Sequence, residues 1–191
     1  MMHPPIVLAS GSPRRKELLA ALGLTFEVLP ADIDEDSFTA SSPSELVKIL
    51  SLEKARVVAK ERTPALIIAA DTIVVLDNEI LGKPKDLEEN RTFLKRLSGQ
   101  AHSVFTGHTL IYENQEVSHV EETRVFFKTL DDAELERYVA TQDGLDKAGG
   151  YGIQGRGAPL ITHVEGDYFT IVGMSVVNVV ELARRLGVTL V

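Results

Sequence analysis

Residues 8–19 read Leu-Ala-Ser-Gly-Ser-Pro-Arg-Arg-Lys-Glu-Leu-Leu, which predicts a short apolar strand, a tight turn and then a helix. Ser12 suits the N-cap of that helix and Pro13 suits its first turn. Arg14 and Arg15 add positive charge where the helix dipole is already positive, at a cost of about 0.3–1 kcal/mol each. A bound anion would reverse the sign of this effect, because backbone amides and guanidinium groups would all face it. The stretch therefore predicts a phosphate-binding helix start, with two solvated arginines as the plain alternative.

Size and composition restrict the class of protein. The 191 residues suit one large domain or two small lobes, and we expect a single domain over residues 1–191. A net charge of −8 argues against nucleic-acid or anionic-membrane binding, so any site for a polyanion must be local. The chain has no cysteine and shows neither a signal-peptide pattern nor an uncharged run long enough to cross a bilayer. We expect a soluble cytoplasmic protein.

Helix and strand signals alternate irregularly along the chain. Helices are expected over residues 13–22, 42–62, 86–99 and 175–187, with another that begins at residue 131. Strands are expected over residues 6–9, 26–29, 66–76, 103–112, 116–128, 160–164 and 168–172. The turns at residues 113–115 and 165–167 predict two hairpins. Strand–helix units combined with hairpins indicate an α/β fold with a mixed, twisted sheet and flanking helices.

Two charged residues lie in apolar patterns. Asp71 interrupts the apolar run Leu66–Leu76, so we expect it at a bulge or strand end that faces a polar cleft, as a metal ligand or a base. A turn between two shorter strands is the alternative. Lys54 lies in line with Leu46 and Leu50 on its predicted helix. Its ammonium group either reaches water from the edge of the core or binds a buried anion.

Two further candidates lie in polar segments. Lys83 belongs to the turn Gly82-Lys83-Pro84, which is either a rigid ligand-binding loop or a plain surface turn. Glu35 belongs to the acidic stretch Asp32–Asp36, which is either solvated or a source of oxygen ligands for a divalent cation.

A glycine-rich segment over residues 146–157 holds five of the 14 glycines. Residues 150–155 match the G-x-G-x-x-G dinucleotide fingerprint, but neither the strand before it nor the helix after it is predicted, so we reject that reading. A loop whose bare backbone approaches a flat ligand fits better. Gln154 could then contact the edge of a base with its amide.

Taken together, these segments resemble the Maf-like nucleotide pyrophosphatases. The matching segments are Leu8–Arg15, Glu53–Ala55, Ala70–Thr72, Gly82–Pro84, Leu97–Gly99 and Asp146–Gly155, in the family's order and spread across nearly the whole chain. The resemblance implies a fold like that of inosine triphosphate pyrophosphatase, with two lobes around a cleft, and commonly a homodimer. It also implies hydrolysis of a nucleoside triphosphate to the monophosphate and pyrophosphate, aided by magnesium or manganese.

The resemblance also assigns expected roles. Asp71 corresponds to the family's proton acceptor, and Arg14, Thr72 and Gln154 correspond to the residues that select the substrate, in a combination that resembles the dTTP/UTP branch. The physical chemistry of the reaction adds a phosphate cradle and a metal site. The expected cradle is Ser10, Ser12, Arg15, Lys54 and Lys83, and the expected metal ligands are Glu35 and Asp71. The same chemistry on 7-methyl-GTP, or a non-catalytic nucleotide-binding regulator of cell division, are the alternatives.

Overall fold

The computed structural model describes residues 4–191, in which seven strands form one mixed sheet. The strands are β1 (Ile6–Leu8), β2 (Glu27–Val28), β3 (Leu66–Leu76), β4 (Glu79–Leu81), β5 (Ala101–Tyr112), β6 (Gln115–Phe127) and β7 (Ile161–Glu165). Their order is β2-β1-β3-β5-β6-β7, with β4 paired to β3. Strand β1 is parallel to both β2 and β3, whereas the β3–β4 and β6–β7 pairs are antiparallel. The predicted mixed sheet is confirmed.

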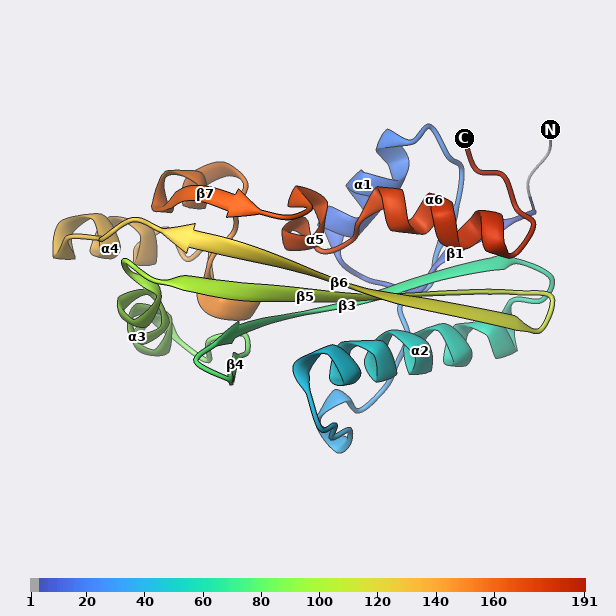
Figure 1. Cartoon of the computed structure of the whole chain (residues 1–191), viewed down its shortest axis with the longest axis horizontal. Helices are drawn as coiled ribbons and strands as arrows, with labels where there is room; N and C mark the ends of the chain where they lie inside the picture. Colours follow the sequence, from blue (N-terminus) through green and yellow to red (C-terminus); the bar gives the residue numbers. More distant parts are fainter. Residues whose placement is uncertain (1–3) are drawn as a thin grey trace. The chain divides into compact units, whose positions relative to one another are not determined.

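Helices flank the sheet (Figure 1). The α-helices are α1 (Pro13–Ala21), α2 (Pro43–Glu61), α3 (Leu87–Leu97), α4 (Asp132–Val139), α5 (Tyr168–Val172) and α6 (Val176–Arg185). Short 3-10 helices cover Glu35–Ser37, Ala148–Gly150 and Gly155–Leu160. No helix of residues 4–191 has the length and apolar character needed to cross a membrane.

Helix boundaries follow local capping chemistry. The side chains of Ser42, Asp86 and Asp131 each accept the amide three residues later, at the starts of α2, α3 and α4. Ser12 is an exception, because it occupies the N-cap of α1 but its side chain makes no capping bond. Its backbone amide instead donates to Ser10 Oγ at 3.2 Å. The prediction that Ser12 occupies the N-cap is therefore confirmed, without a capping bond from its hydroxyl.

The predicted strand over residues 168–172 was wrong, and with it the second hairpin, because this segment forms α5. Its aromatic and β-branched residues favour a strand by propensity. Asp167 overrides that preference, since its side chain accepts the Phe169 amide at 2.9 Å and its carbonyl accepts the Thr170 amide at 3.2 Å. The first hairpin is confirmed, with Glu113 and Asn114 at positive φ between β5 and β6.

The chain divides into two compact units. The first comprises the described residues up to Asp71, together with Thr106–Glu121 and Gly173–Val191. The second comprises Thr72–Phe105 and Glu122–Val172. The cleft and the single domain expected from the sequence remain predictions.

The core of the first unit lies between its strands and helices. In one cluster, Val7, Ile67 and Ile111 from three strands pack with Ala55 and Val58 of α2. Helix α2 packs against β5 so closely that a Cβ on Gly107 would lie 2.2 Å from the Val47 carbonyl oxygen. Helices α1 and α6 cover the opposite face of this unit's strands from α2 (Figure 1). Helices on both faces of the strands thus hold the carboxyl ends of β1 and β3 in place.

The core of the second unit joins α3 and α4 to the strands. Leu94 and Leu97 of α3 and Leu135 of α4 pack with strand residues such as Val104 and Val125. At the surface, Arg91 of α3 donates to both carboxylate oxygens of Glu136 in α4. Burial of apolar side chains contributes more to the stability of this unit than the exposed ion pair, because exposed ion pairs contribute little.

Candidate active site

The strand register places two polar groups near one edge of the first unit. Leu8, the last residue of β1, pairs with Ile68 of β3, and the Ala9 amide donates to the Ile68 carbonyl at 2.8 Å. Ser10 therefore follows the end of β1, and Asp71 lies three residues farther along β3. The carboxyl ends of parallel strands are a common place for ligand sites in α/β folds.

Asp71 lies within the continuous strand β3, so the predicted strand end and the alternative turn were both wrong. Its side chain is 8% exposed, and an unpaired carboxylate at this depth would be strongly disfavoured. Lys54 solves this problem by placing Nζ 2.6 Å from Asp71 Oδ1. The lysine is buried on α2, so the interpretation that it reaches a buried anion is confirmed.

Lys54 also joins a second carboxylate. Its Nζ lies 2.7 Å from Glu35 Oε1, whose side chain is 54% exposed. One ammonium group therefore holds a buried carboxylate and an exposed one at the same point. Among residues 4–191, no cluster of three or more histidine, cysteine or acidic side chains could hold a metal ion. The pair of Glu35 and Asp71 fits a cation that takes its remaining ligands from substrate phosphates and water.

Arg15 connects the start of α1 to two other segments of the first unit. Its Nε donates to the Gly173 carbonyl at 2.8 Å, and its Nη1 donates to Ser10 Oγ at 3.1 Å. Ser10 Oγ also accepts the Ser12 amide. The turn between β1 and α1 thus brings a hydroxyl, a backbone amide and a guanidinium together, as the phosphate-cradle hypothesis requires.

Electrostatics link this cradle to the carboxylates. Burial lowers the pKa of Arg15, whereas the negative charges of Asp71 and Glu35 raise it and the positive charge of Arg14 lowers it. Arg15 therefore lies within electrostatic reach of the Lys54 cluster. The structure thus places Ser10, Ser12, Arg14, Arg15, Glu35, Lys54 and Asp71 in the first unit.

The glycine-rich segment belongs to the second unit, where neutral hydrogen bonds hold its backbone beside the ion pairs of Lys147 with Asp143 and Asp146. Asn90 donates to the Gly150 carbonyl at 2.7 Å, and the Gly152 amide donates to the Tyr138 hydroxyl at 3.0 Å. The Tyr151 hydroxyl lies 2.7 Å from His102 Nε2. Burial lowers the pKa of His102 to about 4, so this imidazole is neutral.

The remaining predicted site residues also belong to the second unit. Lys83 is exposed, and its loop is tied to the glycine segment because the Gly149 amide donates to the Gly82 carbonyl at 3.0 Å. Gln154 is exposed at the start of the 3-10 helix Gly155–Leu160. Thr72, the residue after Asp71 on β3, is half-buried. The second unit therefore brings the loops of Lys83 and Gln154 together.

Sequence reasoning missed two buried histidines that support neighbouring segments. His102 and His108 occupy positions of β5 that are two residues apart from the buried Val104 and Thr106. A polar residue at a core-facing position of a strand must find a partner, and this was the available signal.

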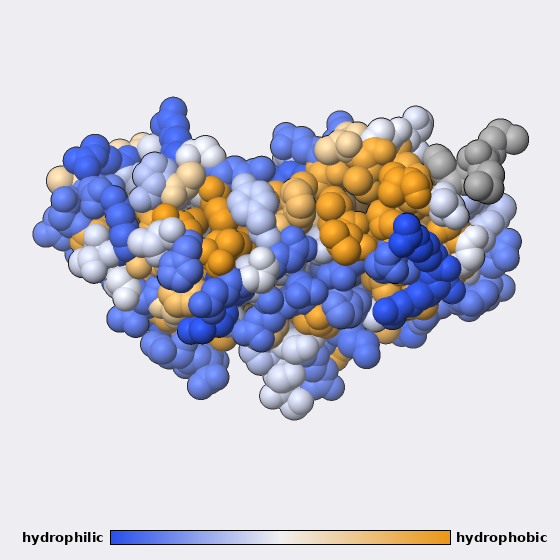
Figure 2. Space-filling view, turned by 45° about the horizontal axis from the view of Figure 1, so that its top comes forward, coloured by the Kyte–Doolittle hydropathy of each residue, from blue (hydrophilic) through white to orange (hydrophobic). Residues whose placement is uncertain are grey.

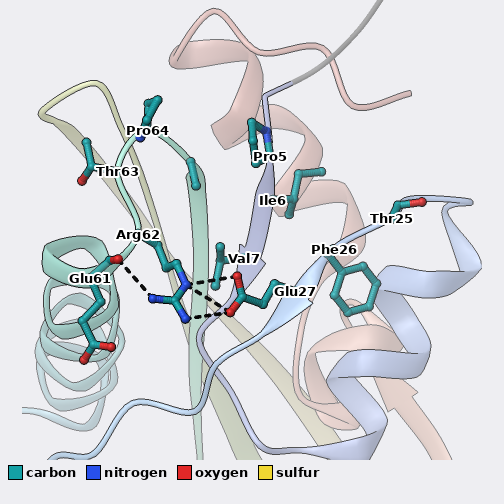
Figure 3. Close-up of a pocket in the computed structure, with 11 residues that line it drawn as sticks. Pro5, Ile6, Val7, Thr25, Phe26, Glu27, Glu61, Arg62, Thr63 and Pro64 are labelled. Atoms are coloured by element: carbon teal, nitrogen blue, oxygen red, sulfur yellow. Dashed lines mark hydrogen bonds and ion pairs between the residues drawn. The ribbon is translucent and has the colours of Figure 1, made fainter.

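A hollow of about 370 Å³ lies elsewhere in the first unit (Figure 3). It is lined by Pro5, Ile6 and Ala65, at the amino ends of β1 and β3. Beside it, the Arg62 guanidinium donates to both carboxylate oxygens of Glu27. The hollow is therefore at the opposite ends of these strands from Ser10 and Asp71, and it is not part of the candidate site.

Comparison with known proteins gives the class to which this chain belongs. The family model described as "Maf-like protein" matches residues 5–186, so the chain belongs to the Maf-like family. A Bacillus cytotoxicus protein named dTTP/UTP pyrophosphatase is 45% identical over 179 residues, which cover 94% of each chain. A Bacillus anthracis protein of the same name is 42% identical over 183 residues, which cover 96% of each chain.

Two solved structures are more distant. A Ham1 protein from Staphylococcus aureus is 17% identical, with a TM-score of 0.48 over 82% of this chain and 79% of its own. A HAM1 protein from Coxiella burnetii is 21% identical, with a TM-score of 0.46 over 65% of this chain and 73% of its own.

Proposed function

We propose that this protein is a nucleoside triphosphate pyrophosphatase that hydrolyses dTTP and UTP to the monophosphate and pyrophosphate. The observation that carries the proposal is the convergence of Lys54 on Asp71 and Glu35, within electrostatic reach of Arg15. The curated relatives, which carry the name of this activity and align along nearly their whole length, support the choice of substrate.

The arrangement suits attack by water on the α-phosphorus. Breaking the bond between the α-phosphorus and the bridging oxygen leaves negative charge on pyrophosphate, which cationic donors must stabilise. Arg15, Lys54 and the Ser12 amide are the donors that the first unit supplies. Asp71 orients the attacking water and accepts its proton, so the protein needs no covalent nucleophile.

Glu35 and Asp71 would hold magnesium or manganese together with phosphate oxygens of the substrate. The bound cation would neutralise charge on the triphosphate as a Lewis acid. Lys54 holds these two carboxylates together before any cation binds, at 2.7 Å and 2.6 Å. The Lys54 ammonium group would then donate to a phosphate oxygen of the substrate.

The second unit supplies the remaining roles in this proposal. Lys83 binds the triphosphate, and Gln154 contacts the edge of the base with its amide. Thr72, together with Arg14 of the first unit, completes the set that selects the nucleotide. The bond that Asn90 donates and the bond that the Tyr138 hydroxyl accepts support Gln154, because they fix the backbone of the glycine segment.

A panel of nucleotides tests the proposal. Purified protein is incubated with magnesium or manganese and with dTTP, UTP, 7-methyl-GTP and the purine triphosphates, and products are separated by ion-exchange chromatography. We expect monophosphate and pyrophosphate from dTTP and UTP. Preference for 7-methyl-GTP would move the protein to another branch of the same chemistry. Release of orthophosphate, or tight binding with no hydrolysis at any metal concentration, would refute the proposed reaction.

We also propose that the protein acts in the cytoplasm as a homodimer. Figure 2 shows apolar residues gathered over the region of α6, where Val177 is 62% exposed. An exposed valine in such a patch supports a pairing surface. Sedimentation analysis of the protein and of Val177→Glu tests this, because the substitution should shift the dimer toward monomer.

A further inference from the structure

His108 is a buried polar residue of β5 that the proposed reaction does not use. It is 0% exposed, and its Nε2 accepts the Ser175 amide at 2.8 Å. Burial, and next to it the positive charge of Arg15, lowers the pKa of His108 to about 3. The imidazole is therefore neutral and, because Nε2 is the acceptor, its proton lies on Nδ1.

The partner of His108 is the segment Gly173–Ser175, which joins α5 to α6. All three of its residues are buried, with Met174 at 0% and Ser175 at 1% exposure. The segment is held at both ends, since the Gly173 carbonyl accepts Arg15 Nε at 2.8 Å and the Ser175 amide donates to His108. A displacement at Ser175 would therefore be transmitted over two residues to the acceptor of Arg15.

Arg15 is sensitive to such a displacement. The guanidinium is planar, so a bond at Nε fixes the plane in which its other donors lie. The second bond, from Nη1 to Ser10 Oγ at 3.1 Å, then sets the direction of the fork. Moving the Gly173 carbonyl would turn the fork away from the Ser10 and Ser12 cradle.

The local packing of β5 explains why the side chain of His108 faces the segment Gly173–Ser175. Gly107 faces α2, where it lies against the Val47 backbone, and the next residue of a strand points to the opposite face. His108 therefore points to the face on which α6 begins. An apolar side chain at position 108 would leave the buried Ser175 amide without this acceptor.

We propose that His108 is a positioning residue that orients Arg15 toward the triphosphate through the segment Gly173–Ser175. This inference rests on the proposed pyrophosphatase function, in which Arg15 binds phosphate. It assigns no contact between His108 and the substrate.

A double-mutant cycle tests the inference. His108→Leu removes the acceptor, His108→Gln keeps an oxygen acceptor near the position of Nε2, and Arg15→Ala removes the group to be oriented. We expect His108→Leu to lower kcat/KM for UTP about tenfold, mainly through KM, and to weaken binding of inorganic pyrophosphate by a similar factor. His108→Gln should remain within about twofold of the wild type. In the Arg15→Ala background, His108→Leu should have no further effect.

The readouts separate positioning from general stability. A merely structural role would lower the urea midpoint without a KM-specific effect, and its loss of activity would persist in full when Arg15 is absent. That persistence, or wild-type kinetics for His108→Leu, would overturn the inference. Should His108→Leu fail to fold, His108→Asn replaces it, because its shorter side chain withdraws the acceptor.

The proposed function is judged separately. Should the wild type hydrolyse no triphosphate, that function fails, and the same cycle measured on pyrophosphate binding by calorimetry still decides whether His108 acts through Arg15. Additive losses in that binding would then overturn the inference by themselves.

Discussion

The two units hold their candidate site residues by different kinds of contact. In the first, charged groups satisfy one another, as Lys54 does with Asp71 and Glu35. In the second, neutral groups such as Asn90 and Tyr138 hold a glycine segment by its backbone. Charged groups placed where negative charge develops in the transition state affect the reaction rate, whereas a fixed backbone segment affects how well a substrate fits. Substitutions in the first unit should therefore change turnover, and those in the second should change selectivity and stability.

Replacing Asp71 with Asn should have the largest effect, because it removes the proton acceptor and leaves the shape unchanged. We expect kcat for dTTP and UTP to fall at least about 100-fold. The fold should persist, since Lys54 keeps its contact with Glu35. Steady-state kinetics with far-UV circular dichroism measure both. Asp36→Asn, at an exposed neighbour of Glu35, is the matched control and should leave kcat unchanged. Normal turnover by Asp71→Asn would remove this carboxylate from the mechanism.

The lysines of the two units offer a direct comparison. Lys54 is buried between two carboxylates, whereas Lys83 is exposed. We expect Lys54→Ala to lower kcat/KM for UTP about 30-fold and Lys83→Ala about tenfold, because charge interactions are stronger away from water. Lys85→Ala controls for charge near Lys83, since Lys85 is exposed and lies in the same loop. Equal kinetics for Lys83→Ala and Lys85→Ala would make Lys83 a plain surface residue.

Acidification should test the buried histidine of the second unit. The folded-state pKa of His102 is about 4, below the value of about 6.5 in an unfolded chain. Between these values the unfolded chain binds more protons, so stability falls with falling pH by about 1.4 kcal/mol per pH unit from this group. Urea unfolding between pH 7 and pH 5 measures the slope. His102→Gln should flatten the slope by that amount, and parallel slopes would show that His102 does not contribute.

Gln154 should affect selectivity more than rate. We expect Gln154→Ala to change the ratio of kcat/KM between UTP and a purine triphosphate by about tenfold or less, the scale of one lost polar contact to a base. Turnover of the preferred nucleotide should change less than with Lys54→Ala. Arg156→Ala, at another exposed position of the same segment, should leave the ratio unchanged. Identical ratios in all three proteins would place base recognition elsewhere.

The sequence predicted the charged part of the site better than the neutral part. Lys54 and Asp71 stood out because each is a charged residue within an apolar pattern. The buried hydrogen bond between them explains how both charges are tolerated there. His108 and Tyr151 gave no comparable signal, since their partners lie 67 and 49 residues away in the chain. The error at Tyr168–Val172 has a similar cause, because a single Asp167 cap outweighed five residues with strand propensity.

Tyr151→Phe provides the smallest test, and it separates buried neutral bonds from exposed charged ones. The substitution deletes the hydroxyl that lies 2.7 Å from His102 Nε2 and keeps the ring that packs edge-on against Phe127. A buried imidazole nitrogen then loses its partner, so we expect the free energy of unfolding in urea to fall by about 1–2 kcal/mol at pH 7. Glu27→Gln is the comparison, because it weakens a carboxylate that accepts several bonds from Arg62 at an exposed position. Solvent and salt screen that pair, so its change should be smaller despite the greater number of bonds. A larger loss for Glu27→Gln would reverse the contrast between the two units, because it would mean that exposed charges contribute more to the folded state than the neutral bonds that hold the glycine segment.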